Sequence, residues 1–338
     1  MVRRSEGSRV RGLAAPKPRS GEGGSEGLPT EAAQPRRRVR RLGACLVAAA
    51  VITAAAAGAV PRGVGRADAA QSALASALVF HAPFDGGADA RRAAGDAKLY
   101  WAPTWGRRAE AQPGLPPADT ALAPGAGRFG DALRFTRRGA PVVFYQGGAN
   151  TPHAASNWSG TVSFWLSTDP QNELGVGFCD PVQITPRAWN NGAFFVEFEK
   201  SKVPGADIPF RLGVYADFPV WNPTKRPFEE IPAAERPLVT VERPPFGAGK
   251  WTHIVYTWES FNTGRPDGVA RLYLDGVPRG TLSPRVQTFT WDPAEAKIAL
   301  GLNYIGLFDD LAVFDRALTD ADVASLHQLE RGVAALHP

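Results

Sequence analysis

The chain has 338 residues, of which 44% are hydrophobic, 10% aromatic and 21% charged, with a formal net charge of +5. This composition supports a substantial buried core and excludes a chain that is disordered throughout. Residues 1–41 contain eleven Lys or Arg and four Glu, a local charge of +7, so residues 42–338 carry a net −2. We therefore expect a basic, disordered tail over 1–41 and a body that binds no nucleic acid.

An uncharged, alanine-rich segment over residues 42–60 follows this tail, and Ala67-Asp68-Ala69 comes soon after it. A basic region, an apolar region and an A-x-A site are the parts of a secretion signal, which predicts cleavage after Ala69. The alternative is an uncleaved single-pass anchor, because nineteen apolar residues approach the roughly 20 that cross a bilayer. Alanine inserts weakly, which favours cleavage. Either way the body is exported to the periplasm, cell surface or medium, and it meets the membrane only through an uncleaved 42–60.

Residues 61–77 are small or polar and predict a linker. From residue 78 onward, short β-type runs are separated by turn residues, and no helical period occurs until the end. These runs cover residues 77–84, 132–135, 141–146, 160–167, 181–185, 193–200, 210–216, 238–242, 251–259, 269–276, 297–301 and 310–314. Many antiparallel strands bury their apolar faces most readily as two packed sheets. We therefore predict one all-β sandwich domain over residues 78–332.

Two local signals support this organisation. Asp275-Gly276 separates two apolar runs and predicts a β-hairpin, since a type I′ turn needs positive φ at both central positions. Near the end, Thr319 can cap a helix, with Asp322 in the position that reaches back to it. Leu318 can then pack on Val323, and an apolar stripe of Val323, Leu326 and Leu329 predicts a short C-terminal helix that covers the sandwich.

Six segments in order resemble the LamG-like jelly-roll domains of the concanavalin A-like lectin and glucanase superfamily. They are LVFHAPFDG (78–86), GRFGDALRF (127–135), GTVSFWLS (160–167), GKWTHIVYTWE (249–259), VARLYLDGVPRG (269–280) and FDDLAVFDRALTDADVASL (308–326). The resemblance implies two curved antiparallel sheets whose first and last strands are neighbours. It also implies binding of carbohydrate or protein in many members, a calcium ion in some and glycosidase activity in a few. The Pro-rich region 201–250 departs from the pattern.

The acids that begin the last predicted strand have two interpretations. Alternation puts Asp309 in phase with Leu311 and Val313, on the inward row, where a carboxylate needs partners. We expect Asp309 to accept backbone N–H bonds at a tight strand entry. The alternative is a calcium site formed by Asp309 or Asp310 with Asp85, because the first and last strands would be adjacent and calcium takes several oxygen ligands.

Glu197 and Glu199 share one face of the strand 193–200, and glycosidases use paired carboxylates, about 5 to 5.5 Å apart in retaining enzymes. The glucanase relatives carry a longer E-x-D-x-E motif, whereas Lys200 and Ser201 follow Glu199 here. We therefore favour a solvated strand face for this pair. Catalysis by Glu197 and Glu199 is the alternative.

Aromatic residues in irregular segments are the better candidates for recognition: Trp189, Phe218, Trp221 and Phe228. Exposed rings can pack on sugar C–H surfaces while neighbouring polar groups bond the hydroxyls. Such rings can also be buried by their own loops. The sequence thus predicts an exported, non-catalytic domain that binds carbohydrate or an extracytoplasmic protein. A glycoside hydrolase and a purely structural envelope protein are the alternatives.

Overall fold

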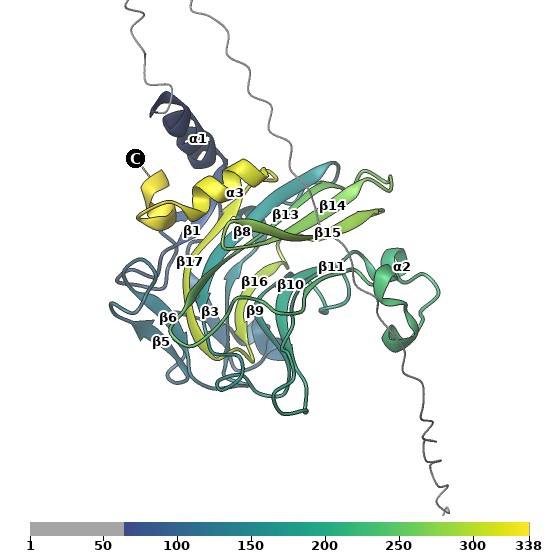
Figure 1. Ribbon diagram of the computed structural model, residues 1–338, viewed down its shortest axis with the longest axis horizontal. Helices are drawn as coiled ribbons and strands as arrows, with labels where there is room; N and C mark the ends of the chain where they lie inside the picture. The colour runs from purple at the N-terminus through teal and green to yellow at the C-terminus, as the bar shows by residue number, and fades with distance from the viewer. Residues whose placement is uncertain (1–63, 338) are drawn as a thin grey trace, which may run out of the picture. The chain divides into compact units, whose positions relative to one another are not determined.

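The structure is a computed structural model that describes residues 64–337. The basic tail, the apolar segment 42–60 and residues 61–63 lie outside this range. Two antiparallel sheets pack face to face (Figure 1). The nine-stranded sheet has the order β15 (Val277–Arg285), β14 (Gly268–Leu274), β13 (Trp251–Phe261), β8 (Trp158–Ser167), β17 (Gly306–Phe314), β1 (Leu78–Ala82) and β2 (Arg92–Ala93). In addition, β6 (Ala132–Phe135) pairs with β17, and β5 (Thr120–Ala123) pairs with β6.

The second sheet has eight strands. Its order is β12 (Leu238–Val241), β11 (Phe210–Tyr215), β10 (Ala193–Lys200), β9 (Gly177–Thr185), β16 (Lys297–Leu302), β7 (Val142–Gln146), β3 (Leu99–Ala102) and β4 (Gln112–Pro113). The predicted two-sheet sandwich is therefore confirmed. Strand alternation explains the core: Phe194, Val196 and Phe198 of β10 are fully buried between the sheets. The residues between them, among them Glu197, face the other way.

Strands β1 and β17 are neighbours, with His81 opposite Ala312, so the two ends of the sandwich meet as the resemblance implied. The hairpin between β14 and β15 is also confirmed, because Asp275 and Gly276 both have positive φ, 54° and 75°. The first feature places the last strand, β17, within the nine-stranded sheet, and the second makes β15 an edge strand of it.

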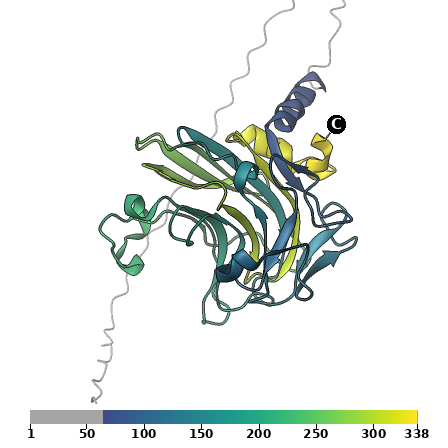
Figure 2. The same cartoon turned by 180° about the vertical axis from the view of Figure 1, so that it is seen from behind.

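Helices cover the outer face of the nine-stranded sheet, where α1 (Val64–Ala77), α3 (Asp320–His327) and the 3-10 helix η5 (Gly332–Leu336) gather (Figures 1 and 2). Their apolar residues form one buried cluster with the sheet, which includes Leu74, Val323 and Leu336. Gln71 Nε2 donates to the Ala335 carbonyl at 2.8 Å. Residues 64–77 therefore form a packed helix where a linker was expected, and the packed fold continues past residue 332. Among residues 64–337 no helix is long and apolar enough to cross a membrane.

The C-terminal helix α3 starts as the sequence predicted. Thr319 accepts a bond from the Asp322 N–H, and the Asp322 carboxylate accepts one from the Thr319 N–H at 3.0 Å, so a full capping box is present. Val323 and Leu326 are buried, and Leu329 packs against the same cluster. This stripe fixes α3 on the sheet.

The predicted inward orientation of Asp309 is wrong. Phe308 and Leu311 both belong to the core, so the two acids between them form a β-bulge, and Asp310 takes a positive φ of 53°. The bulge breaks the alternation, and Asp309 lies opposite Trp165, whose ring stacks on His253 of the outer face. Asp309 is nevertheless fully buried, because this face is covered.

Within the Pro-rich region 201–250, the short helix α2 (Phe218–Trp221) and the 3-10 helices η3 (Phe228–Glu230) and η4 (Ala233–Glu235) form a lobe between β11 and β12 (green in Figure 1). Two further 3-10 helices, η1 (Trp105–Glu110) and η2 (Gly148–Asn150), flank β3 and β7. The lobe is the part that departs from the family pattern, and it supplies one wall of the cavity described next.

Candidate functional site

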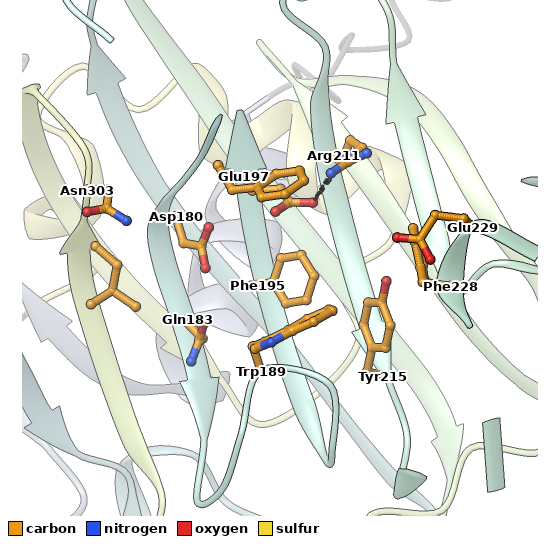
Figure 3. Close-up of a pocket in the computed structure, with 12 residues that line it drawn as sticks. Asp180, Gln183, Trp189, Phe195, Glu197, Arg211, Tyr215, Phe228, Glu229 and Asn303 are labelled. Carbon is orange, nitrogen blue, oxygen red and sulfur yellow. Dashed lines mark hydrogen bonds and ion pairs between the residues drawn. The ribbon is translucent and has the colours of Figure 1, made fainter. Parts of the chain in front are cut away.

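A pocket of about 490 Å³ opens on the face of the eight-stranded sheet that points away from the core (Figure 3). Strands β9, β10, β11 and β16 form its floor, while the loop after β9 and helix η3 form its walls. The lining residues are Phe178, Asp180, Gln183, Trp189, Phe195, Glu197, Arg211, Tyr215, Phe228, Glu229, Leu302 and Asn303. The volume lies within the range of about 300 to 1,000 Å³ that is typical of small-ligand sites.

A β-bulge in β9 decides which residues of that strand reach the pocket. Val196 lies opposite Val182, but Phe198 lies opposite Cys179, so β9 has one extra residue at Asp180-Pro181. Strict alternation would place Asp180 and Gln183 on opposite faces, and the extra residue brings both to the pocket. Pro181 is tolerated at this position because a bulge residue need not donate to the ladder.

Three aromatic rings form a corner on this floor. Phe195 of β10 stacks on Tyr215 of β11 with ring centroids 5.4 Å apart, and Trp189 meets Tyr215 nearly edge to face, at 5.6 Å and 71°. Figure 3 shows Trp189 between Gln183 and Tyr215. Trp189 is 49% exposed, whereas Phe195 and Tyr215 are buried. A large indole face is therefore presented to solvent on a rigid aromatic base.

One arginine holds the two strand glutamates. Arg211 donates to Glu197 Oε1 from Nε at 2.9 Å and from Nη2 at 2.5 Å, and to Glu199 Oε2 from Nη1 at 2.6 Å. Burial raises the pKa of Glu197, and Arg211 opposes that rise. The two carboxylates thus share one cation on the sheet surface, an arrangement that locks all three side chains in place.

Four polar side chains that line the pocket have no hydrogen-bond partner within residues 64–337: Asp180, Gln183, Tyr215 and Asn303. Gln183 is only 4% exposed and Tyr215 only 1%, so the little access these groups have is through the pocket. Burial, and then the neighbouring Glu197, raise the pKa of Asp180 well above its ordinary value, while Arg211 opposes the rise. The site therefore offers donors and acceptors that the protein does not use.

The structure separates the four predicted aromatic residues into two pairs. Trp189 and Phe228 line the pocket. Trp221 packs nearly edge to face with Tyr215, with ring centroids 4.9 Å apart, and its Nε1 donates to the Asn190 carbonyl. Phe218 in turn packs on Trp221. Trp221 and Phe218 thus support the wall and do not line the cavity.

Glu197 and Glu199, the alternative catalytic pair, do share one face of β10 as expected, but Arg211 binds both. Sequence reasoning missed the strand residues that complete the site, Asp180, Phe195 and Tyr215 among them. Alternation along β10 and β11 was the available signal, because residues 195, 211 and 215 are in phase with Glu197 across the register. Pro181 inside an apolar run was the signal for the bulge that exposes Asp180.

The proposed calcium ligands are engaged in bonds within the protein. Asp85 Oδ1 accepts from the Asp131 N–H at 2.9 Å. Asp310 accepts from His81 Nε2 at 2.7 Å and from the Val333 N–H at 2.9 Å. Asp309 Oδ2 accepts a backbone bond, from the Phe129 N–H at 2.9 Å. Across residues 64–337 no group of three or more His, Cys, Asp or Glu is arranged to hold a metal ion, and the calcium site stays a prediction.

Comparison with known proteins gives one family and several solved structures of similar fold. The family model described as the concanavalin A-like lectin/glucanases superfamily matches residues 145–324. No curated protein matched this chain.

Three of the similar structures are ligand-binding or binding domains. Domain 4 of AbnA, an extracellular arabinanase from Geobacillus stearothermophilus solved with arabinotriose, is 18% identical with a TM-score of 0.44, over 74% of this chain and 98% of that one. The binding domain of Paraclostridial Mosquitocidal Protein 1 is 14% identical with a TM-score of 0.45, over 75% and 52%. The botulinum neurotoxin serotype D ligand-binding domain, solved with N-acetylneuraminic acid, is 10% identical with a TM-score of 0.45, over 77% and 52%.

This chain spans about half the length of the two toxin domains, and at these identities the likeness concerns the fold alone. The family model covers more than half of the chain and includes most strands of both sheets. The chain belongs to the concanavalin A-like lectin/glucanases superfamily.

Proposed function

We propose that this protein is an exported, non-catalytic binding protein that recognises carbohydrate in the pocket over β9, β10 and β11. The observation that carries the proposal is the set of partnerless polar groups beside an exposed ring: Asp180, Gln183, Tyr215 and Asn303 around Trp189. Polar groups that line an apolar pocket fix the orientation of a ligand through hydrogen bonds, so these groups favour a ligand that supplies hydroxyls.

Carbohydrate satisfies both halves of this site. Its C–H faces can pack on an indole, and its hydroxyls can donate to and accept from the surrounding side chains. Burial keeps the Tyr215 hydroxyl protonated by raising its pKa, so it can donate. A rigid aromatic floor also lowers the entropy that a ligand loses on binding, because Phe195 and Tyr215 are already held by packing.

Export is part of the proposal and rests on the sequence of residues 36–69. The contacts of helix α1 with the rest of the domain include Gln71, Leu74, Ala75 and Ala77, which all follow Ala69. Cleavage after Ala69 would leave these four residues in place. N-terminal sequencing of the exported protein tests this: a sequence that starts at Ala70 supports it, and an intact residue 1 on an exported form supports the anchor instead.

Binding is tested with the purified full chain on a glycan array, followed by calorimetry on the best glycan. Trp189→Ala should weaken binding by at least about tenfold, roughly 1.4 kcal/mol, because the exposed stacking face is lost. Val203→Ala, a change at a side chain that is 67% exposed outside the pocket, is the matched control and should leave affinity unchanged. The array is run with and without calcium, so that ion dependence is measured together with recognition.

The same preparation distinguishes the other functions. Release of reducing sugar that Glu197→Gln abolishes would show an enzyme and overturn the non-catalytic proposal. The ion pairs of both glutamates with Arg211 argue against that outcome, since a shared cation stabilises the ionised carboxylates and weakens them as bases. Retention of no glycan, with capture of a protein from the cell envelope, would overturn carbohydrate recognition.

A further inference from the structure

The pocket has more acidic than basic groups. Asp180, Glu197 and Glu229 line it, and Glu199 lies beside them on β10. Arg211 is the one cation among the lining residues, and it is already bonded to both Glu197 and Glu199. Its charge is therefore neutralised within the protein, and little positive potential is left to attract an anionic ligand.

The aromatic rings suit a cation as well as a sugar face. Trp189 stands at 71° to both Phe195 and Tyr215, so the indole and the stacked pair form two walls of a corner. The face of an aromatic ring carries partial negative charge, and two ring faces beside a carboxyl group are the arrangement that holds ammonium groups in proteins. This observation is independent of the count of acids.

We propose that the pocket selects glycans that bear a free, positively charged amino group, such as hexosamine oligomers without N-acetyl groups, and rejects glycans that carry carboxylate or sulfate. The ammonium group would lie in the corner of Trp189 and Tyr215, in a pocket whose acids are Asp180, Glu197 and Glu229. This inference rests on the carbohydrate function proposed above and names the chemical class of its ligand.

The state of Asp180 is consistent with this ligand. Burial, and then Glu197, raise the pKa of Asp180, while Arg211 opposes the rise. A positive charge placed beside it favours the ionised form, because opposite charges within about 4–6 Å stabilise each other. A ligand carboxylate would instead meet Glu197 and Glu229 and add a like charge to a site that is already acidic.

The test compares three oligomers of equal length by calorimetry with the purified full chain at about pH 6, where an amine is protonated. The probes are a glucosamine tetramer, its fully N-acetylated counterpart and a galacturonate tetramer. We expect the glucosamine tetramer to bind at least about tenfold more tightly than the N-acetylated one, and the galacturonate tetramer not to bind. The preference should shrink as salt is raised, since it is electrostatic.

Variants of pocket residues test whether the pocket causes the preference for the glucosamine tetramer. Asp180→Asn and Glu229→Gln should each reduce the ratio of the two affinities by several-fold. Glu330→Gln removes an exposed acid outside the pocket and should leave the ratio unchanged. Equal or tighter binding of the N-acetylated tetramer, or any binding of galacturonate at this site, would overturn the amine preference while carbohydrate binding stands. Binding of none of the three tetramers would overturn the amine preference, and the glycan array decides the proposed function separately.

Discussion

The ring of Phe195 lies over Gly213 on the neighbouring strand, where a Cβ atom at position 213 would come within 2.2 Å of Phe195 Cζ. Gly213 belongs to β11 and sits between Arg211 and Tyr215 on the pocket face, so the missing side chain is what allows Phe195 to lie flat and stack on Tyr215. A glycine inside a strand weakens it, and such a residue often marks a close approach of this kind. The aromatic floor of the pocket therefore depends on a residue that contributes no side chain to it.

Gly213→Val should displace Phe195 and disturb the stack with Tyr215. We expect glycan affinity to fall by at least about tenfold and stability to fall by roughly 1–3 kcal/mol from overpacking. Calorimetry and chemical denaturation measure the two effects. Gly247→Ala is the matched control, since nothing lies within 4 Å of a Cβ there. Unchanged affinity in a folded Gly213→Val protein would mean that the floor does not contact the ligand.

The pair formed by Arg211 and Glu197 gives a second prediction. Both side chains are largely buried, at 11% and 9% exposure, so Arg211→Met leaves a carboxylate with no cation beside it. Breaking a buried pair costs roughly 3–5 kcal/mol, and we expect a loss of that order near neutral pH. The double variant Arg211→Met/Glu197→Gln should recover much of it. As a control, Arg243→Met breaks an exposed pair with Asp207 and should cost under about 1 kcal/mol.

The pKa of Glu197 determines how the stability of Arg211→Met changes with pH. Burial already raises the pKa of this carboxyl, and removal of Arg211 takes away the group that opposes the rise. Acidification then protonates Glu197 and removes the unpaired charge. The stability gap between Arg211→Met and the unmodified protein should therefore narrow as the pH falls, and a gap that widens would contradict this account.

The sequence was a good guide to the sandwich because strand alternation is a local property. The runs at 132–135 and 193–200 coincide with β6 and β10, and the hairpin at Asp275 and the cap at Thr319 form as their local chemistry dictates. Helix α1 was missed for the converse reason. Its sequence has little apolar periodicity, and its stability comes from packing on α3 and η5, which no local pattern records.

The two bulges explain most of what could not be predicted at the sites. The extra residue at Asp180-Pro181 reverses the faces along β9, and the positive φ of Asp310 does the same at the start of β17. A single slip moves every following side chain to the other face, so an alternation argument fails from that point on. The pocket was predicted only through Trp189 and Phe228, which lie in irregular segments where alternation was not used.

The buried His253 gives a third prediction. Its side chain stacks on Trp165 and its Nε2 lies 2.9 Å from Ser163 Oγ. Burial, and then the nearby His327, lower the pKa of His253 to about 3, against about 6.5 in the unfolded chain. Between these two values the unfolded chain holds a proton that the folded protein excludes. Stability should therefore fall as the pH drops below about 6.5, by up to roughly 1.4 kcal/mol per unit.

Urea unfolding of the full chain between pH 4 and pH 8 measures this slope. His253→Gln removes the titrating ring and should flatten the acid side of the profile. Ser163→Ala keeps the ring and removes its partner, so it should retain the slope even if overall stability is lower. An acid slope that is the same in His253→Gln as in the unmodified protein would show that another group causes it.

The buried carboxyl of Asp309 should make the stability of the protein depend on pH in the direction opposite to that of His253. One carboxyl oxygen accepts the Phe129 N–H, while Oδ1 is buried with no hydrogen-bond partner within residues 64–337. Burial raises the pKa of Asp309 to about 8, Phe129 opposes the rise and Asp310 adds to it. The folded protein thus keeps a proton that the unfolded chain releases near pH 4. Stability should be lost as the pH rises from about 4 to about 8, by an amount on the order of 1 kcal/mol per unit.

Asp309→Asn tests this dependence because an amide cannot ionise and its oxygen can still accept the Phe129 N–H. Above pH 8 the variant should be more stable than the unmodified protein by a few kcal/mol at most, while near pH 4 the two should be similar. Glu330→Gln makes the same change in net charge at an exposed position and should not alter the profile. A variant that is less stable at pH 8 would mean that the ionised carboxylate of Asp309 is stabilised in the folded protein. In that case added calcium should raise the stability of the unmodified protein and leave the stability of Asp309→Asn unchanged. That result would support the predicted calcium site, even though Asp85 and Asp310 accept hydrogen bonds within the protein.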